Sequence, residues 1–124
     1  MSEENVKQEE ILEEKKEEQV SKEQIDAWKQ EYGKMYRSTF GPHTFYWHPF
    51  NRKTYNETMG GTVAIEDVDE LIVERRIQSI LKNTVYPSQE EVIAILEDNY
   101  GIIESFPNII LEKSGFYQSE TDEL

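Results

Sequence analysis

The chain has 124 residues, with 26 acidic and 13 basic side chains, a formal net charge of −13 and no cysteine. This length predicts one domain with tails. The negative charge disfavours nucleic acid and anionic membranes as partners, and the lack of cysteine excludes disulfide bonds, cysteine–zinc sites and thiol nucleophiles. The N-terminus shows no signal-peptide pattern and no apolar run is long enough for a membrane span, so we expect a cytoplasmic protein.

Charge is distributed unevenly along the sequence. Residues 1–31 hold eleven acidic and five basic side chains, whereas residues 32–56 hold no Asp or Glu. We call residues 32–56 the acid-free window. Its charge of +4 comes from Lys34, Arg37, Arg52 and Lys53. An acidic leader, an acid-free aromatic middle and an acidic helical half therefore follow one another.

The domain organisation follows from this pattern. Residues 1–20 are predicted to form an acidic tail or a solvated helix, because their few apolar residues make no continuous stripe. A single domain is predicted over residues 21–117, followed by an acidic tail over residues 118–124. The domain is expected to begin at Ser21, whose SKEQ pattern is a capping box.

The first predicted helix starts at this capping box. Ile25, Trp28 and Tyr32 recur at helical spacing and share one face, and Gly33 is placed to end the helix. The sequence therefore predicts a short amphipathic helix with an aromatic face.

A β-hairpin is predicted next. Two runs rich in aromatic and β-branched residues, 34–40 and 43–50, flank Gly41-Pro42. Strand alternation assigns one face to Phe45, Trp47 and Pro49 and the other to Tyr46, His48 and Phe50. Because proline cannot donate to a strand ladder, the second strand is expected to lie at a sheet edge or to end at Pro49. The expected core residues of the hairpin are Phe45, Trp47 and Phe50.

Four short helices are predicted after the hairpin. The expected N-caps of the first three are Asn51, Asp67 and Ser88, and their expected ends are Gly60, a break at the NTVYP sequence of residues 83–87, and Asn99. The last helix is expected to begin near Ser105 with Pro107 in its first turn and to stop at Gly115. The expected core-facing residues are Val68, Leu71, Ile72, Val73, Ile77, Ile80, Leu81, Val92, Ile93, Ile95, Leu96, Ile110 and Leu111. This order of elements predicts an α+β fold.

Residues 43–55 gather both histidines and a cluster of aromatic rings, which raises the question of a metal or catalytic site. His43 and His48 lie an odd number of residues apart, so their rings point to opposite faces of a strand and do not favour a shared metal ion. No apolar carboxylate pair, phosphate-binding glycine loop or acyl-transfer motif accompanies them. We therefore expect no catalytic residues, no metal, no cofactor and no enzymatic activity.

Two binding roles remain for the acid-free window. Aromatic strands flanked by basic residues can stack nucleic-acid bases, but four cations in a chain of charge −13 disfavour this. The preferred interpretation is a docking site for a protein partner at Lys34, Arg37, Arg52 and Lys53, the stretch where neighbouring carboxylates do not dilute the positive charge. The alternative is that these cations pair with the acidic leader or the helix ends of the same chain.

Several motifs resemble those of small proteins from tailed bacteriophages. The segment IDAWKQEYGKMYRSTFGPHTFYWHPFNRKTYNE is similar to their opening, where a tryptophan-bearing helix, a short hairpin and an R-x-[LFT]-x-R-x-x-Y segment follow one another. ELIVERRIQSILKNTVYP resembles their helix that ends in a VLYP-type step, and GIIESFPNIILEKSGF resembles their closing helix. The resemblance covers residues 24–117 in order. It departs at His48-Pro49, where an arginine step is usual, and in the cysteine-free helix before VYP.

Phage proteins of this kind are tail or baseplate assembly chaperones, or small components of the virion. The resemblance implies a non-enzymatic binding protein of phage morphogenesis, with an assembly chaperone as the first expectation and a structural virion component as the alternative. A nucleic-acid-binding regulator is the third. The implied partners are other phage tail or virion proteins, in the host cytoplasm during assembly or in the virion.

Overall fold

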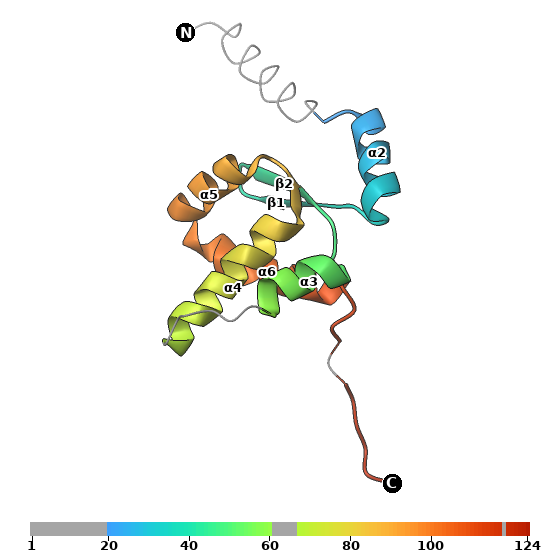
Figure 1. Ribbon diagram of the computed structural model, residues 1–124, viewed down its shortest axis with the longest axis vertical. Helices are drawn as coiled ribbons and strands as arrows, with labels where there is room; N and C mark the ends of the chain where they lie inside the picture. The colour runs from blue at the N-terminus through green and yellow to red at the C-terminus, as the bar shows by residue number, and fades with distance from the viewer. Residues whose placement is uncertain (1–19, 61–66, 118) are drawn as a thin grey trace, which may run out of the picture. The chain divides into compact units, whose positions relative to one another are not determined.

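The computed structural model describes residues 20–60, 67–117 and 119–124 (Figure 1). Within them lie five helices, α2 (Lys22–Tyr32), α3 (Arg52–Met59), α4 (Val68–Asn83), α5 (Gln89–Asp98) and α6 (Tyr100–Lys113), and three strands, β1 (Tyr36–Phe40), β2 (His43–Trp47) and β3 (Thr84–Tyr86). The strands form one antiparallel sheet in the order β1-β2-β3. The predicted α+β fold is confirmed. The predicted leader lies, apart from Val20, outside the described residues.

Helix α2 and the chain from Lys34 onward belong to two separate compact units. At the start of α2 the Gln24 backbone N–H donates to the Ser21 hydroxyl (3.1 Å), as the capping sequence predicts. At its end Gly33 has a φ of 86° and donates its N–H to the Lys29 carbonyl. No residue of α2 is buried. A domain that begins at Ser21 therefore stays a prediction.

The predicted hairpin is present around Gly41-Pro42. Gly41 has a φ of 59°, a conformation that glycine adopts without strain, and the proline fixes the next φ, so the two residues form a tight turn. Phe40 and His43 close this turn, and the pairing runs on to Tyr36 and Trp47 at the other end.

The short strand β3 differs from the prediction of a simple break at residues 83–87. Thr84 and Tyr86 pair with β2, which makes β2 the central strand and not an edge strand. β2 does end before Pro49, and the His48 N–H donates to the Asn83 carbonyl (2.9 Å). Four consecutive residues at the end of β2 and just after it are buried: Phe45, Tyr46, Trp47 and His48. Side chains from both predicted faces of this segment are therefore buried.

The predicted N-caps of α3, α4 and α5 are confirmed. At α3 the cap is reciprocal, since the Thr54 N–H donates to the Asn51 side chain (2.8 Å) and the Asn51 N–H donates to Thr54 Oγ1 (3.1 Å). The side chains of Asp67 and Ser88 accept first-turn N–H groups in α4 and α5. The predicted end of α3 at Gly60 is also confirmed.

Helix α6 begins earlier than predicted. The expected start near Ser105 is wrong, because the helix begins at Tyr100 and places Pro107 in its interior. Asn99 ends α5, and its backbone carbonyl accepts the Ile102 N–H (3.0 Å). Because no loop separates the two helices, no loop signal in the sequence marks the start of α6. Pro107 is buried and cannot donate to the carbonyl four residues before it, so the helix lacks that hydrogen bond.

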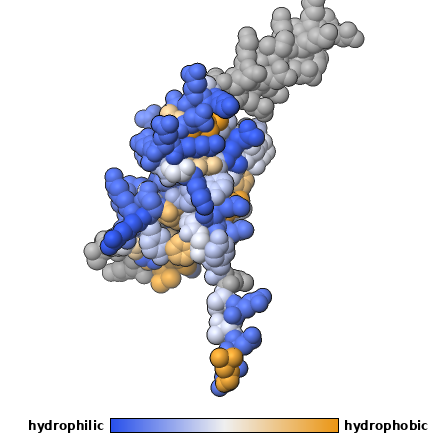
Figure 2. All heavy atoms as spheres, turned by 90° about the vertical axis from the view of Figure 1, so that its right-hand side faces the viewer, coloured by the Kyte–Doolittle hydropathy of each residue, from blue (hydrophilic) through white to orange (hydrophobic). Residues whose placement is uncertain are grey.

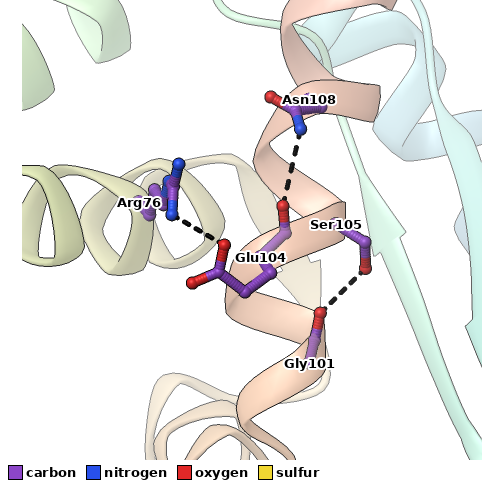
Figure 3. Close-up of polar contacts among 5 residues, drawn as sticks. All are labelled: Arg76, Gly101, Glu104, Ser105 and Asn108. Atoms are coloured by element: carbon purple, nitrogen blue, oxygen red, sulfur yellow. Dashed lines mark hydrogen bonds and ion pairs between the residues drawn. The ribbon is translucent and has the colours of Figure 1, made fainter.

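Polar side chains on α6 either turn back onto the helix or reach α4 (Figure 3). The Ser105 hydroxyl donates to the Gly101 carbonyl (3.0 Å), and Asn108 Nδ2 donates to the Glu104 carbonyl (3.5 Å). Arg76 of α4 forms an ion pair with Glu104 (2.9 Å). This pair links the two helices at their solvent-exposed side.

The core lies between the sheet and helices α4, α5 and α6. It consists of Phe45, Trp47, Ile80, Val92, Leu96, Ile102, Ile103, Phe106 and Ile110, with Phe50 packed against it. Phe106 is its centre, since the centroid of its ring lies 5.1 to 5.6 Å from those of Phe40, Phe45 and Trp47. The helix thus inserts an aromatic ring against the face of the hairpin.

The predicted core faces of the helices are only partly correct. Ile80, Val92, Leu96 and Ile110 are buried as expected, whereas Val68, Ile72 and Ile93 are exposed. The buried residues of α4 all lie in its C-terminal half, so its first turns extend beyond the core. Helix α5 buries two residues one turn apart and leaves the remaining apolar positions at the margin or in solvent.

Candidate functional site

The four predicted partner-binding cations are exposed: Lys34, Arg37, Arg52 and Lys53. Two ion pairs occur within the described residues, Arg76 with Glu104 and Lys82 with Glu57, and neither uses these cations. Pairing with helix ends is therefore not seen in the described part of the chain. The acidic leader lies outside it.

Three of the four cations lie next to the same end of the sheet. Tyr36, the first residue of β1, pairs with Trp47, the last residue of β2. Lys34 precedes Tyr36 by two residues, and Arg52 and Lys53 follow Trp47 as the first two residues of α3. The structure therefore gathers these three at the end where β1 begins and β2 ends.

Arg37 is set apart from this group. It lies opposite Tyr46 in the strand register, so its side chain leaves the sheet on the face away from Trp47. Lys113, at the end of α6, lies with the group instead, because its Nζ is 5.8 Å from the ring centroid of Tyr36. Sequence reasoning missed Lys113, since it lies far outside the acid-free window.

An exposed aromatic stack borders the cations of α3. The rings of Tyr55 and Phe116 stack with centroids 5.4 Å apart and planes 23° apart, and Phe50 contacts Tyr55 edge-on at 5.6 Å. Ser114 fixes this arrangement, because its hydroxyl accepts the Phe50 N–H (2.8 Å). Phe116 is 52% exposed and the next residue, Tyr117, is 79% exposed.

We define the aromatic–basic patch as Phe50, Arg52, Lys53, Tyr55, Phe116 and Tyr117. Arg52 and Tyr55 lie one turn apart and share one face of α3. Figure 1 shows α3 beside the C-terminal end of α6, where the patch forms. On the face that Figure 2 shows, hydrophobic residues lie in small groups among hydrophilic ones.

The charges at the start of α3 oppose the stability of that helix. Its first turn contains two cations and no acidic residue, although a helix N-terminus disfavours each cation by about 0.3–1 kcal/mol. Helices α2, α4 and α5 carry acidic residues in their first turns. Helix stability therefore does not explain Arg52 and Lys53, and their role as partner-binding residues stays a prediction.

The two histidines have structural contacts. His43 Nε2 lies 3.4 Å from the Asn99 side-chain amide, and the buried His48 lies with Nδ1 2.8 Å from the Pro49 carbonyl. The described residues contain no group of three or more side chains suited to hold a metal ion. Partial desolvation and the neighbouring Glu31 carboxylate raise the pKa of the Tyr32 phenol in α2.

The aromatic residues of β2 are not available to stack on bases. Trp47 is 1% exposed and Phe45 is fully buried. Among the described helices, none is both long and apolar enough to cross a membrane. Comparisons of the chain with protein-family models, curated proteins and solved structures found no match. The resemblance to phage proteins therefore stays a prediction.

Proposed function

We propose that the chain is a non-enzymatic binding protein of bacteriophage morphogenesis, and in the first place a tail or baseplate assembly chaperone. It acts in the host cytoplasm on other tail or virion proteins. The phage context is supported by the motif order of residues 24–117. The binding role is supported by the aromatic–basic patch, where the exposed Phe116 ring stacks on the half-buried Tyr55 ring beside two cations that make no ion pair within the described residues.

The patch favours a partner segment that is apolar with acidic flanks. Tyr55, Phe116 and Tyr117 offer aromatic area, which is the largest source of binding energy in small interfaces. Arg52 and Lys53 orient carboxylates beside those rings, and Arg52 can bind a carboxylate through two parallel bonds. The net charge of −13 keeps other acidic segments away from the rest of the surface.

The double variant Arg52→Glu with Lys53→Glu tests this proposal. It places acids at the positive end of α3, so we expect the unfolding midpoint to stay constant or to rise by a few degrees. Tail proteins of the infecting phage should no longer co-purify with the variant from infected cells. Thermal unfolding by circular dichroism and affinity purification measure the two outcomes.

The matched control is Lys22→Glu with Lys29→Glu, which makes the same change of charge at two exposed positions of α2. It should retain co-purification, since α2 lies outside the patch. Survival of co-purification in the Arg52 and Lys53 variant would refute docking at the patch, and the exposed Val68 and Ile72 of α4 would be the next surface to mutate.

A structural component of the virion is the alternative within the same class. Sedimentation of purified virions followed by immunodetection of the chain separates the two, because a chaperone is absent from the finished particle and a component is present. The nucleic-acid regulator is the third interpretation. Its test is salt-dependent retention on single-stranded DNA, which the charge of −13 opposes.

A further inference from the structure

Strand β1 forms an outer edge of the sheet. The two-residue turn makes Phe40 and His43 a hydrogen-bonded pair, and such pairs alternate along an antiparallel ladder. Ser38 and Tyr36 therefore also bond to β2, while Arg37 and Thr39 turn their N–H and C=O groups outward. Tyr46, opposite Arg37, supports this pattern because it pairs with β3 on its other side.

This edge has little protection against an added strand. Arg37 and Thr39 are exposed, and no backbone hydrogen bond from the described residues reaches their outward groups. The register of β1 with β2 is continuous over five residues, without a bulge, and no proline interrupts the strand. Its one charge, Arg37, makes no ion pair with any described residue.

An open depression lies at the far end of the same edge. It has a volume of about 380 Å³ and is lined by Phe40 and the turn on one side and by Gly101, Ile102 and Ser105 of α6 on the other. The Ser105 hydroxyl is already bonded to the helix (Figure 3), which leaves Phe40 and Ile102 as the main contacts for an entering side chain.

We propose that the outer edge of β1 is a second docking site, which takes up an extended segment of a partner protein as a fourth strand. An acidic side chain of that segment lies opposite Arg37, and an apolar side chain three residues away lies beside Phe40 in the depression. Main-chain bonds supply affinity in this mode, and the alternating side chains supply specificity. The site is separate from the aromatic–basic patch and does not depend on the phage assignment.

A second copy of this chain is a poorer occupant. Symmetric pairing of two β1 strands brings together two chains that each carry a charge of −13, and it places no carboxylate opposite Arg37. A partner segment with one acidic residue places a carboxylate opposite Arg37.

The test uses the full-length ¹⁵N-labelled chain and the synthetic peptide Ser-Leu-Thr-Thr-Glu-Thr-Thr. In the antiparallel register that sets the peptide glutamate opposite Arg37, its leucine falls opposite Phe40. Without peptide, the amides of Arg37 and Thr39 should exchange with solvent faster than those of Ser38 and Phe40. Saturating peptide should slow exchange at Arg37 and Thr39 at least about tenfold.

Three controls test the strand geometry, and a fourth variant tests the charge of Arg37. The same peptide methylated on the backbone nitrogens of its third and fifth residues should have no effect, because these N–H groups face Thr39 and Arg37. Thr39→Pro removes an outward N–H but no bond to β2, and should abolish the slowing at Arg37. Thr39→Val keeps that N–H and should preserve the slowing. Arg37→Glu should weaken peptide binding roughly threefold or more.

Unchanged exchange at Arg37 and Thr39 in millimolar peptide would overturn the proposal, as would equal slowing by the methylated peptide. Slowing that grows with protein concentration in the absence of peptide would identify a second copy as the occupant and would also overturn it. None of these measurements involves phage proteins, so their outcome is independent of the assembly role.

Discussion

Trp47 connects the sheet to α6 and shows how one side chain organises this small core. Its ring stacks on Tyr36 with centroids 4.9 Å apart and meets Phe106 edge-on at 5.6 Å. Its indole N–H donates to the Ser38 hydroxyl across the hairpin (2.9 Å), so burial leaves no polar atom of the ring unsatisfied. The residue thus combines apolar burial with a fixed orientation.

Trp47→Ala should lower the free energy of unfolding by about 3–5 kcal/mol, because it removes a large buried ring and leaves a cavity. That is a large share of the 5–15 kcal/mol typical of small domains. Urea unfolding followed by circular dichroism measures the change. Trp47→Phe is the matched control and should cost less, since it keeps an aromatic ring and loses chiefly the bond to Ser38. A stable Trp47→Ala protein would mean that the ring is not a core anchor.

At the scale of elements, the contact between α3 and α4 is unusually polar. Thr54 and Thr58 of α3 are buried, as are Ser79 and Asn83 of α4. The Ser79 hydroxyl and the Asn83 amide donate back into their own helix (2.7 Å each). The Thr58 hydroxyl and the Asn83 side-chain oxygen have no hydrogen-bond partner in the described residues. Helix α3 is therefore held less by apolar contacts than α6 is.

Two identical substitutions in α3 should have opposite effects on stability. Thr58→Val replaces an unsatisfied hydroxyl at a position that is 6% exposed, so it should stabilise the protein by up to about 1 kcal/mol. Thr54→Val, at 8% exposure, removes the acceptor of the Asn51 N–H and should destabilise it by about 1 kcal/mol. Chemical denaturation of both variants gives the comparison. A loss of stability in Thr58→Val would show that its hydroxyl has a partner, such as a bound water.

The elements that could be predicted from sequence are those set by local chemistry. The N-caps at Ser21, Asn51, Asp67 and Ser88 involve hydrogen bonds within three residues, and all four are present. Strand β3 is too short for a visible alternation and exists only through its pairing with β2. The start of α6 was missed because proline is typical of the first turn of a helix, whereas Pro107 lies in the interior of α6.

For the candidate site, too, the sequence predicts local features and misses those that depend on tertiary contacts. The sequence indicated the exposed cations, because an interval without carboxylates can be counted directly. It did not indicate the aromatic–basic patch, because Tyr55 and Phe116 meet only after the chain has folded. Nor did it separate Arg37 from the others, which depends on the strand register. Composition therefore predicts the charge of this surface, and tertiary packing decides its shape.

At the scale of the whole molecule, the end of the acidic N-terminal sequence lies close to the boundary between the two compact units. Among the described residues, those from Val20 to Gly33 belong to one compact unit and those from Lys34 onward to the other. Residues 1–31 carry eleven acidic and five basic side chains, whereas the sheet begins in the acid-free window. Acidic residues are concentrated outside the unit that contains the sheet. Their charge favours solubility and adds self-repulsion, but these side chains are not part of the hydrophobic core.

Truncation at this boundary is the remaining prediction. Removal of residues 1–20 takes away eight acidic and three basic side chains, and should change the unfolding midpoint by less than about 4 °C. Removal of residues 1–33 should also change it little, because no residue of α2 is buried and the unit that holds the sheet begins at Lys34. Differential scanning calorimetry of both truncated proteins at low and high salt measures this, and salt should narrow any difference that arises from charge repulsion. A fall of the midpoint only in the shorter protein would place the domain boundary at Ser21, as the capping box predicts. A fall in both would show that the acidic leader itself packs on the domain.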